Sequence, residues 1–246
     1  AYKVDMQLRP SGKAGPVVCS LDAYREYHQS SAQLWERQAL IKTRFIAGDP
    51  GLGREIEKIA EGFAYGSGLA KEGVEEIHHL RMRMERELAG EDDSRFNLKK
   101  GRGGLVDIEF LTQMLQLSHG RSSAKLRRRE TLEALSALHD EKILTPGEYK
   151  VLSEGYLFLR RLDHRLRLER DQSIDAFEAE PARLQSIARA LGYQSGGKGK
   201  ANPGARLLRD YQKNREQIRA CYERYFVAAA GENAEAKSAI QSRLPE

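Results

Sequence analysis

The sequence has few of the residues that would build a site from sulfur or imidazole. It contains two cysteines and six histidines in 246 residues. Cys19 and Cys221 lie far apart and form no C-x-x-C pattern, so we expect two reduced, partly buried thiols. Only His78 and His79 are close together, and adjacent residues on a helix point about 100° apart. The sequence therefore predicts no disulfide framework, no zinc site and no serine- or cysteine-based catalytic triad.

A long apolar run is also missing. No segment approaches the roughly 20 apolar residues that a helix needs to cross a bilayer, and no signal-peptide pattern opens the chain. The content of 40% hydrophobic and 31% charged residues suits a soluble helical protein rather than a disordered one. We expect a cytoplasmic protein without a membrane partner.

The excess of positive charge is small, because 41 basic residues face 36 acidic ones and leave a net charge of +5. The densest basic clusters lie at residues 125–129 and among the arginines of residues 160–170. Acidic residues alternate with the basic ones, and no aromatic residues are interleaved as platforms for stacking bases. Such runs are typical of solvated helix faces, and we expect no nucleic-acid partner.

Strand patterns are confined to the start of the chain. Residues 2–8 alternate apolar and polar side chains, which predicts a half-buried strand, and residues 16–19 suit a short return strand. After Ser20, which suits a helix N-cap, nearly every periodic segment predicts a helix. The expected helices cover residues 21–29, 33–47, 51–63, 71–89, 104–119, 130–141, 146–170, 181–191 and 204–229, with a weak tail helix at 233–243.

The helices are amphipathic, which predicts how they assemble. In the segment 104–119 the apolar residues recur at helical spacing and form one stripe, and the segment 146–170 does the same. Long amphipathic helices joined by short turns imply a helical bundle. Residues 192–204 are rich in glycine and predict a flexible surface loop. The fold class is therefore mainly α.

A glycine-rich turn at residues 101–104 opens directly into an apolar-periodic helix. Backbone N–H groups at such a turn can hold a phosphate, and adjacent glycines permit a left-handed turn. Asp107 and Glu109 are two positions apart and lie on different faces of the helix, so they are not a catalytic pair. Whether Gly103, Gly104, Asp107 and Glu109 bind a nucleotide or only build the helix start stays open, since Asp107 also suits the positive end of the helix dipole.

Four strings in a fixed order carry a family resemblance, which covers about residues 2–168 and weakens toward 226. They are VDMQLRPSGKAGPVVCSLDAY, LWERQALIKTR, NLKKGRGGLVDIEF and YLFLRRLDHRL. The chain resembles the adenylyl-transferring half of bacterial glutamine synthetase adenylyltransferases. This resemblance implies residues 1–20 as the last strands of a nucleotidyltransferase domain and residues 21–246 as a helical bundle like that of PII uridylyltransferases.

The resemblance also implies a reaction and its partners. Enzymes of this family transfer AMP from ATP to a tyrosine of glutamine synthetase, need Mg²⁺, and regulate nitrogen assimilation. Glutamine synthetase, a PII signal protein and glutamine as an effector are the implied partners. The uridylyltransferases share a Gly-Gly-Leu-x-Asp-Ile string, but the WERQA and LRPSG strings favour the adenylyltransferases. A regulatory or interaction module without chemistry of its own is the other alternative.

Asp5 matches the third of the carboxylates that hold magnesium in this family, which makes it the implied catalytic and metal residue. Its spacing alone favours an exposed strand aspartate paired with Lys3. No Gly-Ser turn followed by an Asp-x-Asp pair precedes Asp5, although family members have one. We therefore expect the chain to begin at the last strand of the catalytic domain and to lack a complete active site.

Basic residues near this strand are the implied nucleotide ligands. Arg9 and Lys13 follow the strand exit, where they suit either phosphate binding or an ordinary polar turn. Arg37, Lys42 and Arg44 share one expected helix and are candidates to line the mouth of the active site and stabilise charge on the transferred phosphate. Trp35, on the same helix, is expected to pack between domains, and Glu36 to hold one of these cations in place.

Overall fold

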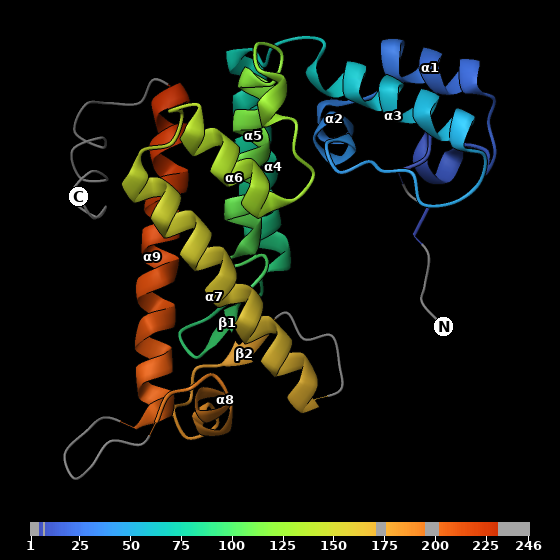
Figure 1. The fold of residues 1–246 in the computed structure, drawn as a ribbon. Coiled ribbons are helices and arrows are strands. Elements are labelled where there is room, and N and C mark those ends of the chain that lie inside the picture. Colours follow the sequence, from blue (N-terminus) through green and yellow to red (C-terminus); the bar gives the residue numbers. More distant parts are fainter. Residues whose placement is uncertain (1–4, 7, 171–175, 195–201, 231–246) are drawn as a thin grey trace.

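The chain is almost entirely helical in the computed structural model, which describes residues 5–6, 8–170, 176–194 and 202–230 (Figure 1). The predicted mainly α fold class is confirmed. None of the described helices is long and apolar enough to cross a membrane. The helices are α1 Leu21–Ser30, α2 Leu34–Leu40, α3 Pro50–Tyr65, α4 Lys71–Leu88, α5 Leu105–His119, α6 Thr131–Asp140, α7 Pro146–Arg170, α8 Gln185–Ala190 and α9 Pro203–Ala230, with short 3-10 turns η1 Gly12–Ala14 and η2 Ala124–Leu126.

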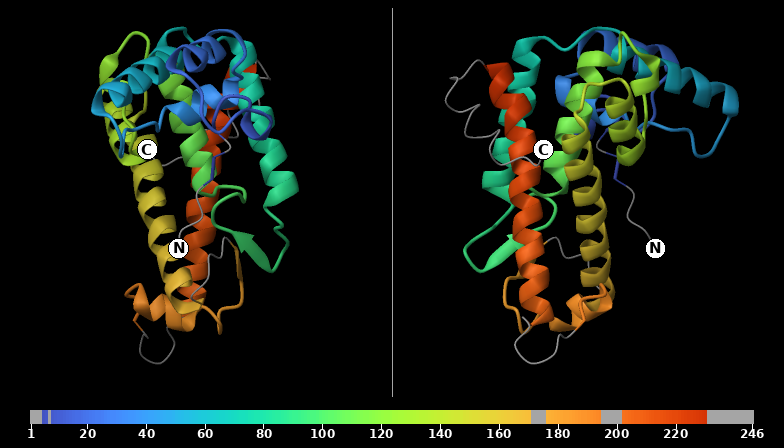
Figure 2. Two further views of the ribbon diagram at one scale, coloured as in Figure 1. Left: turned by 90° about the vertical axis from the view of Figure 1, so that its right-hand side faces the viewer. Right: turned by 60° about the vertical axis from the view of Figure 1, so that its left-hand side comes forward.

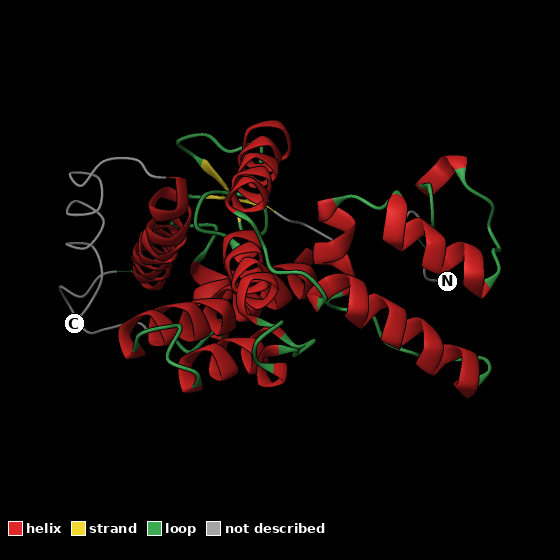
Figure 3. Cartoon of the chain, turned by 90° about the horizontal axis from the view of Figure 1, so that it is seen from above, coloured by secondary structure: helices red, strands yellow, loops and turns green. Residues whose placement is uncertain are grey.

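The described chain forms a helical body and a smaller lobe. The helical body consists of α4 to α9, in which α7 packs against both α6 and α9. The N-terminal lobe consists of α1, α2 and α3, and it lies beside the upper end of the body (Figure 2). Seen from above, the helices nearest the N-terminus project to one side of the body (Figure 3). The lobe contacts the body through α2, which lies against α4 and α5.

Helix α5 forms the centre of the core because α4, α6, α7 and α9 all pack against it. Its predicted apolar stripe is confirmed, since Leu105, Ile108, Leu111, Met114 and Leu115 are all buried. The stripe on α7 is buried as well, at Leu152, Leu159, Leu162 and Leu166. Burial of these two stripes removes apolar surface from water and stabilises the helical body.

The predicted return strand at residues 16–19 is wrong, and these residues form bends and irregular chain. Of the predicted strand 2–8, residues 1–4 and 7 lie outside the described residues, and Asp5, Met6 and Leu8 are not in a strand. The chain instead turns where the Gly12 N–H donates to the carbonyl of Arg9 at 2.8 Å. A strand needs a neighbour for its backbone hydrogen bonds, and no described segment supplies one here.

The predicted helix 33–47 ends early, at Leu40. Beyond it, Lys42 and Thr43 close tight turns on the carbonyls of Ala39 and Leu40. The chain then runs as irregular structure, with a bend at residues 47–48, to Asp49. The Asp49 side chain accepts from the Leu52 N–H at 2.7 Å and caps α3. Because a capping residue is extended, α2 and α3 cannot be continuous, and Arg44 lies outside any helix.

Two short strands were not predicted. Strand β1, Arg95–Asn97, pairs antiparallel with β2, Ala176–Glu178, so that Phe96 faces Phe177. Three residues are too few to display an alternating pattern in sequence. Helix α8 starts at Gln185 rather than at residue 181. Residues 195–201 of the predicted flexible loop and the whole of the predicted tail helix 233–243 lie outside the described residues.

Candidate functional site

The glycine-rich turn requires glycine for different reasons at its two adjacent positions. Gly103 has a φ of +68°, and a Cβ atom there would lie 2.0 Å from the carbonyl oxygen of Arg215. Gly104 is extended, with a φ of −85°, but its Cβ would lie 2.8 Å from the carbonyl oxygen of Leu98. The left-handed residue of the turn is therefore Gly103, against which the backbone of α9 lies directly.

The backbone N–H groups from Lys99 to Asp107 all donate to acceptors inside the protein. Lys99 and Lys100 donate to the side-chain oxygen of Asn97, at 3.0 and 2.9 Å. Side chains of Glu91 and Asp107 accept from Arg102 and Gly103, and backbone carbonyls accept the others. No amide of the turn is left to bind a phosphate. These contacts favour the structural alternative for Gly103 and Gly104.

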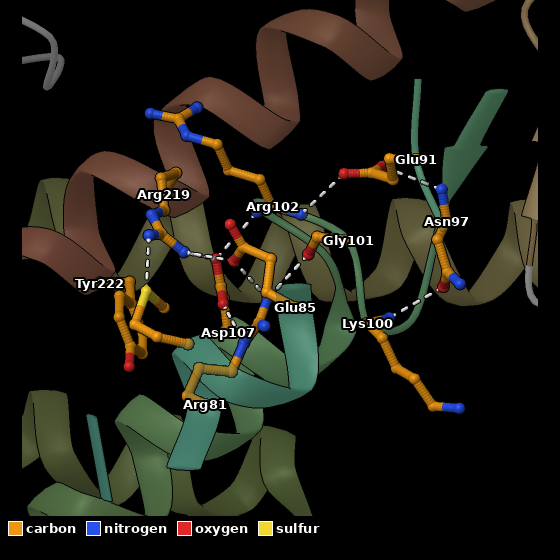
Figure 4. Close-up of polar contacts among 12 residues, drawn as sticks. Arg81, Glu85, Glu91, Asn97, Lys100, Gly101, Arg102, Asp107, Arg219 and Tyr222 are labelled. Carbon is orange, nitrogen blue, oxygen red and sulfur yellow. Dashed lines mark hydrogen bonds and ion pairs between the residues drawn. The ribbon is translucent and has the colours of Figure 1, made fainter. Parts of the chain in front are cut away.

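Asp107 lies in a buried network of charges rather than at a surface (Figure 4). One carboxylate oxygen accepts from Arg81 Nε, and the other accepts from the Gly103 N–H at 2.8 Å and from Arg219 Nη1 at 3.3 Å. Arg219 also pairs with Glu85 at 2.8 Å. Asp107 thus links α4, α5, α9 and the glycine turn, and these contacts favour a structural role for it.

Helix α9 holds the other side of the turn. Arg215 Nε donates to the carbonyl of Arg102 at 3.1 Å, and its Nη2 donates to Glu91 at 3.0 Å. Arg102 in turn pairs with Glu216 at 2.7 Å. Sequence reasoning missed all of these contacts, because the partners are separated by more than 100 residues and no local pattern relates them.

Glu109 lies on a different face of α5 from Asp107, as its spacing predicts. It is partly buried, and burial raises its pKa, while the positive charges of Lys42, Arg160 and Lys99 oppose the rise without cancelling it. Lys42 Nζ also donates to Thr131 Oγ1 at 2.8 Å. We call Glu109, Lys42, Lys99 and Arg160 the Glu109 cluster. Its members come from α5, the turn after α2, the segment before the glycine turn and α7, and the charges of the three cations act on the Glu109 carboxyl.

The Glu109 cluster is the candidate functional site. It brings together two predicted site residues, Lys42 and Glu109, and adds two cations to which the sequence had assigned no role. Lys99 and Arg160 both lie within strings that carry the family resemblance, NLKKG and LFLRR, and that is the signal that could have found them. Three cations around one partly buried carboxylate suit the binding of a phosphate group and the stabilisation of charge that develops on it.

The remaining predicted ligands do not join this cluster. Arg37 is buried and donates to the carbonyls of Ala64 and Gly68, at 2.8 and 3.3 Å, so it fixes the turn that follows α3. Arg44 is exposed and lines a separate groove of about 470 Å³ with residues 127–129. Trp35 is 40% exposed, so it is not a core anchor of the described chain.

The N-terminal candidates lie at the surface. Asp5 and Lys13 are exposed, and Arg9 closes its own turn by donating to the carbonyls of Met6 and Gly15, at 2.9 and 3.3 Å. The described residues contain no group of three side chains suited to hold a metal ion. One carboxylate holds magnesium poorly, so the described residues do not by themselves fit a magnesium site. A metal role for Asp5 stays a prediction.

Glu109→Gln is expected to raise the melting temperature of the chain at neutral pH. A carboxyl group whose pKa is raised in the folded state stabilises the fold only while it is protonated, and this contribution is lost as the pH rises through the folded pKa. Glutamine carries no charge that burial must strip of water. In acid Glu109 is neutral as well, so the gain in melting temperature should vanish there. Thermal unfolding of both chains at acidic and neutral pH measures it. If the two melting temperatures differed equally at both pH values, the difference would not come from the raised pKa of Glu109.

Comparison with known proteins places the sequence in a family. The family model described as GlnD PII-uridylyltransferase matches residues 73–226, which include the glycine turn, Glu109 and Arg160. The chain belongs to this family. The model described as glutamate-ammonia ligase adenylyltransferase matches residues 1–59, which include Asp5 and Lys42. The helical body and the N-terminal segment are thus matched separately, and the predicted resemblance to glutamine synthetase adenylyltransferases is confirmed.

Curated relatives agree with this assignment. A bifunctional glutamine synthetase adenylyltransferase/adenylyl-removing enzyme of Streptomyces avermitilis is 35% identical over 92% of the chain and 22% of its own length. Proteins of the same name from Streptomyces coelicolor and Aromatoleum aromaticum are 34% and 37% identical over 92% and 78% of the chain. The chain spans about a fifth of the length of these relatives, 22% and 20% for these two.

Proposed function

We propose that the chain takes part in the transfer of AMP from ATP to a tyrosine hydroxyl of glutamine synthetase. The observation that carries the proposal is the pair of family matches within one chain, the adenylyltransferase match at residues 1–59 and the uridylyltransferase match at residues 73–226. Both families are named for the transfer of a nucleotidyl group, one to PII and the other to glutamate-ammonia ligase. The Glu109 cluster supports the proposal because it draws on both matched segments.

In this proposal the tyrosyl oxygen attacks the α-phosphorus of ATP, the bond to the β-phosphate breaks, and pyrophosphate leaves. The proton of the tyrosyl hydroxyl passes to a base or to solvent. Lys42, Lys99 and Arg160 hold the phosphates and stabilise the charge of the transition state. Mg²⁺ belongs to the proposal through the resemblance of Asp5 to a metal ligand. Asp5 needs further carboxylates beside it to hold the ion.

The decisive experiment replaces Arg160 by glutamine in the intact protein that contains this chain. Transfer of label from α-labelled ATP to glutamine synthetase should fall by about 100-fold, the scale on which loss of one electrostatic element acts. Arg161→Gln is the matched control, because Arg161 is the next residue on α7, is exposed, and makes no ion pair with any described residue. Equal labelling of glutamine synthetase by the Arg160 and Arg161 variants would contradict the proposed role of the Glu109 cluster.

Glu109→Gln separates a functional from a merely structural cluster. We expect this change to stabilise the fold while it slows transfer. Opposite effects of this kind on stability and activity are typical of functional sites. A purely structural residue loses both together. Activity that follows the melting temperature would therefore favour the alternative of a regulatory module without chemistry of its own.

The finer parts of the proposal concern location and control. We place the protein in the cytoplasm, with glutamine and a PII signal protein as its regulators, on the strength of the family resemblance. The alternative is that the chain, as a relative of the PII uridylyltransferases, takes part in the transfer of UMP from UTP to a PII protein. Incubation with labelled ATP and labelled UTP, each with glutamine synthetase and with a PII protein, distinguishes the two. Label from UTP on the PII protein alone would favour that alternative.

A further inference from the structure

Helix α5 carries two carboxylates near its start, and only one of them is available to a ligand. Both oxygens of Asp107 accept from arginines, and one of them accepts from the glycine turn as well. Glu109 forms no hydrogen bond or ion pair with any described residue. Buried polar groups are nearly always hydrogen-bonded, so a partly buried carboxylate without a donor points to a ligand that supplies one.

The Glu109 carboxylate can be reached from outside. The residue is only partly buried, and neither of its carboxylate oxygens is fully buried. The next polar side chain on this face of α5 is Gln113, one turn further along, and it accepts from the side chain of Gln38 at 2.7 Å. Gln113 is thus satisfied by α2, whereas Glu109 keeps both oxygens for a hydroxyl group that another molecule brings.

The positive charges of Lys42, Arg160 and Lys99 act on Glu109 without direct contact. Glu109 forms an ion pair with none of them, although all three favour its charged form. Lys42 is held in place by α6, since its Nζ donates to Thr131 Oγ1 at 2.8 Å. The carboxylate therefore lies in a positive field that also attracts phosphate oxygens, and no salt bridge has to break before Glu109 accepts a hydrogen bond.

These surroundings make Glu109 a stronger proton acceptor than an exposed glutamate. Burial raises the pKa of its carboxyl above the ordinary value, and the three cations limit the rise. A general base works best when its pKa lies near the working pH, and partial burial is how enzymes bring a glutamate toward that condition. Glu109 thus combines access, free lone pairs and a suitable basicity next to cations that suit phosphate.

We propose that Glu109 is the catalytic base that takes the proton from the acceptor tyrosine, an inference that rests on the proposed transfer reaction. The tyrosyl hydroxyl donates a hydrogen bond to a Glu109 oxygen. As the tyrosyl oxygen bonds to the α-phosphorus of ATP, its proton moves to Glu109. The bond from the α-phosphorus to the bridging oxygen breaks, and its electron pair leaves with pyrophosphate. Glu109 then returns the proton to solvent.

The test uses glutamine synthetase whose acceptor tyrosine is replaced by tetrafluorotyrosine, because the hydroxyl of this residue is ionised at neutral pH and needs no base. With the natural tyrosine, Glu109→Gln in the intact protein should slow a single turnover by about 100-fold or more, the range of general base catalysis. With the fluorinated acceptor, the variant should be slower than the unmodified enzyme by less than about tenfold. An equal loss with both acceptors would overturn the proposal.

Two further variants separate the base from the rest of the reaction. Arg160→Gln should lose the same factor with both acceptors, because Arg160 acts on phosphate charge and not on the proton. Glu76→Gln is the matched control, since Glu76 is an exposed glutamate of α4 that makes no ion pair with any described residue, and it should transfer normally. A slow Arg160 variant beside a normal Glu109 variant would overturn the base and leave the transfer reaction standing. If neither variant slowed transfer, the base and the proposed role of the Glu109 cluster would both be wrong.

Discussion

Asp107→Asn is expected to lower the free energy of unfolding of the chain by about 3–5 kcal/mol, the usual cost of removing one partner from a buried ion pair. Arg81 is fully buried and Arg219 is 8% exposed on its side chain, so water cannot replace the lost charge. The amide NH₂ of asparagine would also face a guanidinium donor in either of its two orientations, Arg81 in one and Arg219 in the other. Urea unfolding followed by circular dichroism measures the change.

Two further variants test the physical reason for this loss. Glu109→Gln removes a carboxylate from the same helix two residues away, and it should not lower the stability. Asp107→Asn combined with Arg219→Met should cost less than the sum of the two single changes, because both remove one shared contact. Strict additivity, or a loss below about 1 kcal/mol for Asp107→Asn, would mean that the network stabilises little.

Gly103→Ala is expected to cost about 2–5 kcal/mol, the second large effect. Part of this comes from a φ of +68°, which a side chain resists, and part from a Cβ only 2.0 Å from the carbonyl oxygen of Arg215. That oxygen belongs to the backbone of α9, which cannot move aside as a flexible side chain does. The same unfolding experiment applies.

Gly62→Ala is the control for Gly103→Ala. Gly62 lies within α3, and a Cβ there meets nothing within 4 Å. Alanine at this position should therefore stabilise the chain by up to about 1 kcal/mol, the difference in helix propensity. If both alanine variants were equally stable, the glycine turn would not be constrained by α9.

The helices could be predicted from the sequence because their information is local. The stripes on α5 and α7 recur every three to four residues, and the capping residue Ser20 marks where α1 starts. The expected helix 33–47 fails for the opposite reason. Nothing in its periodicity reveals that the chain must leave the helix at Leu40 in order to reach the cap of α3.

The candidate site was only partly predictable. Spacing places Asp107 and Glu109 about 200° apart around α5, so one of them had to point away from the other. Which of the two faces inward depends on Arg81 and Arg219, which come from α4 and α9. No local pattern relates residues so far apart in the chain. For the same reason the approach of Arg160 to Glu109 was visible only in the folded protein.

The contacts between α9 and the glycine turn also have a consequence for biosynthesis. A ribosome makes residues 101–107 long before it makes Arg215 and Arg219. Until these arginines emerge, the carbonyl of Arg102 and the second oxygen of Asp107 lack their α9 partners. The nascent turn therefore stays incomplete while α5 to α8 are translated, and the helical body acquires its final form only when α9 closes onto it.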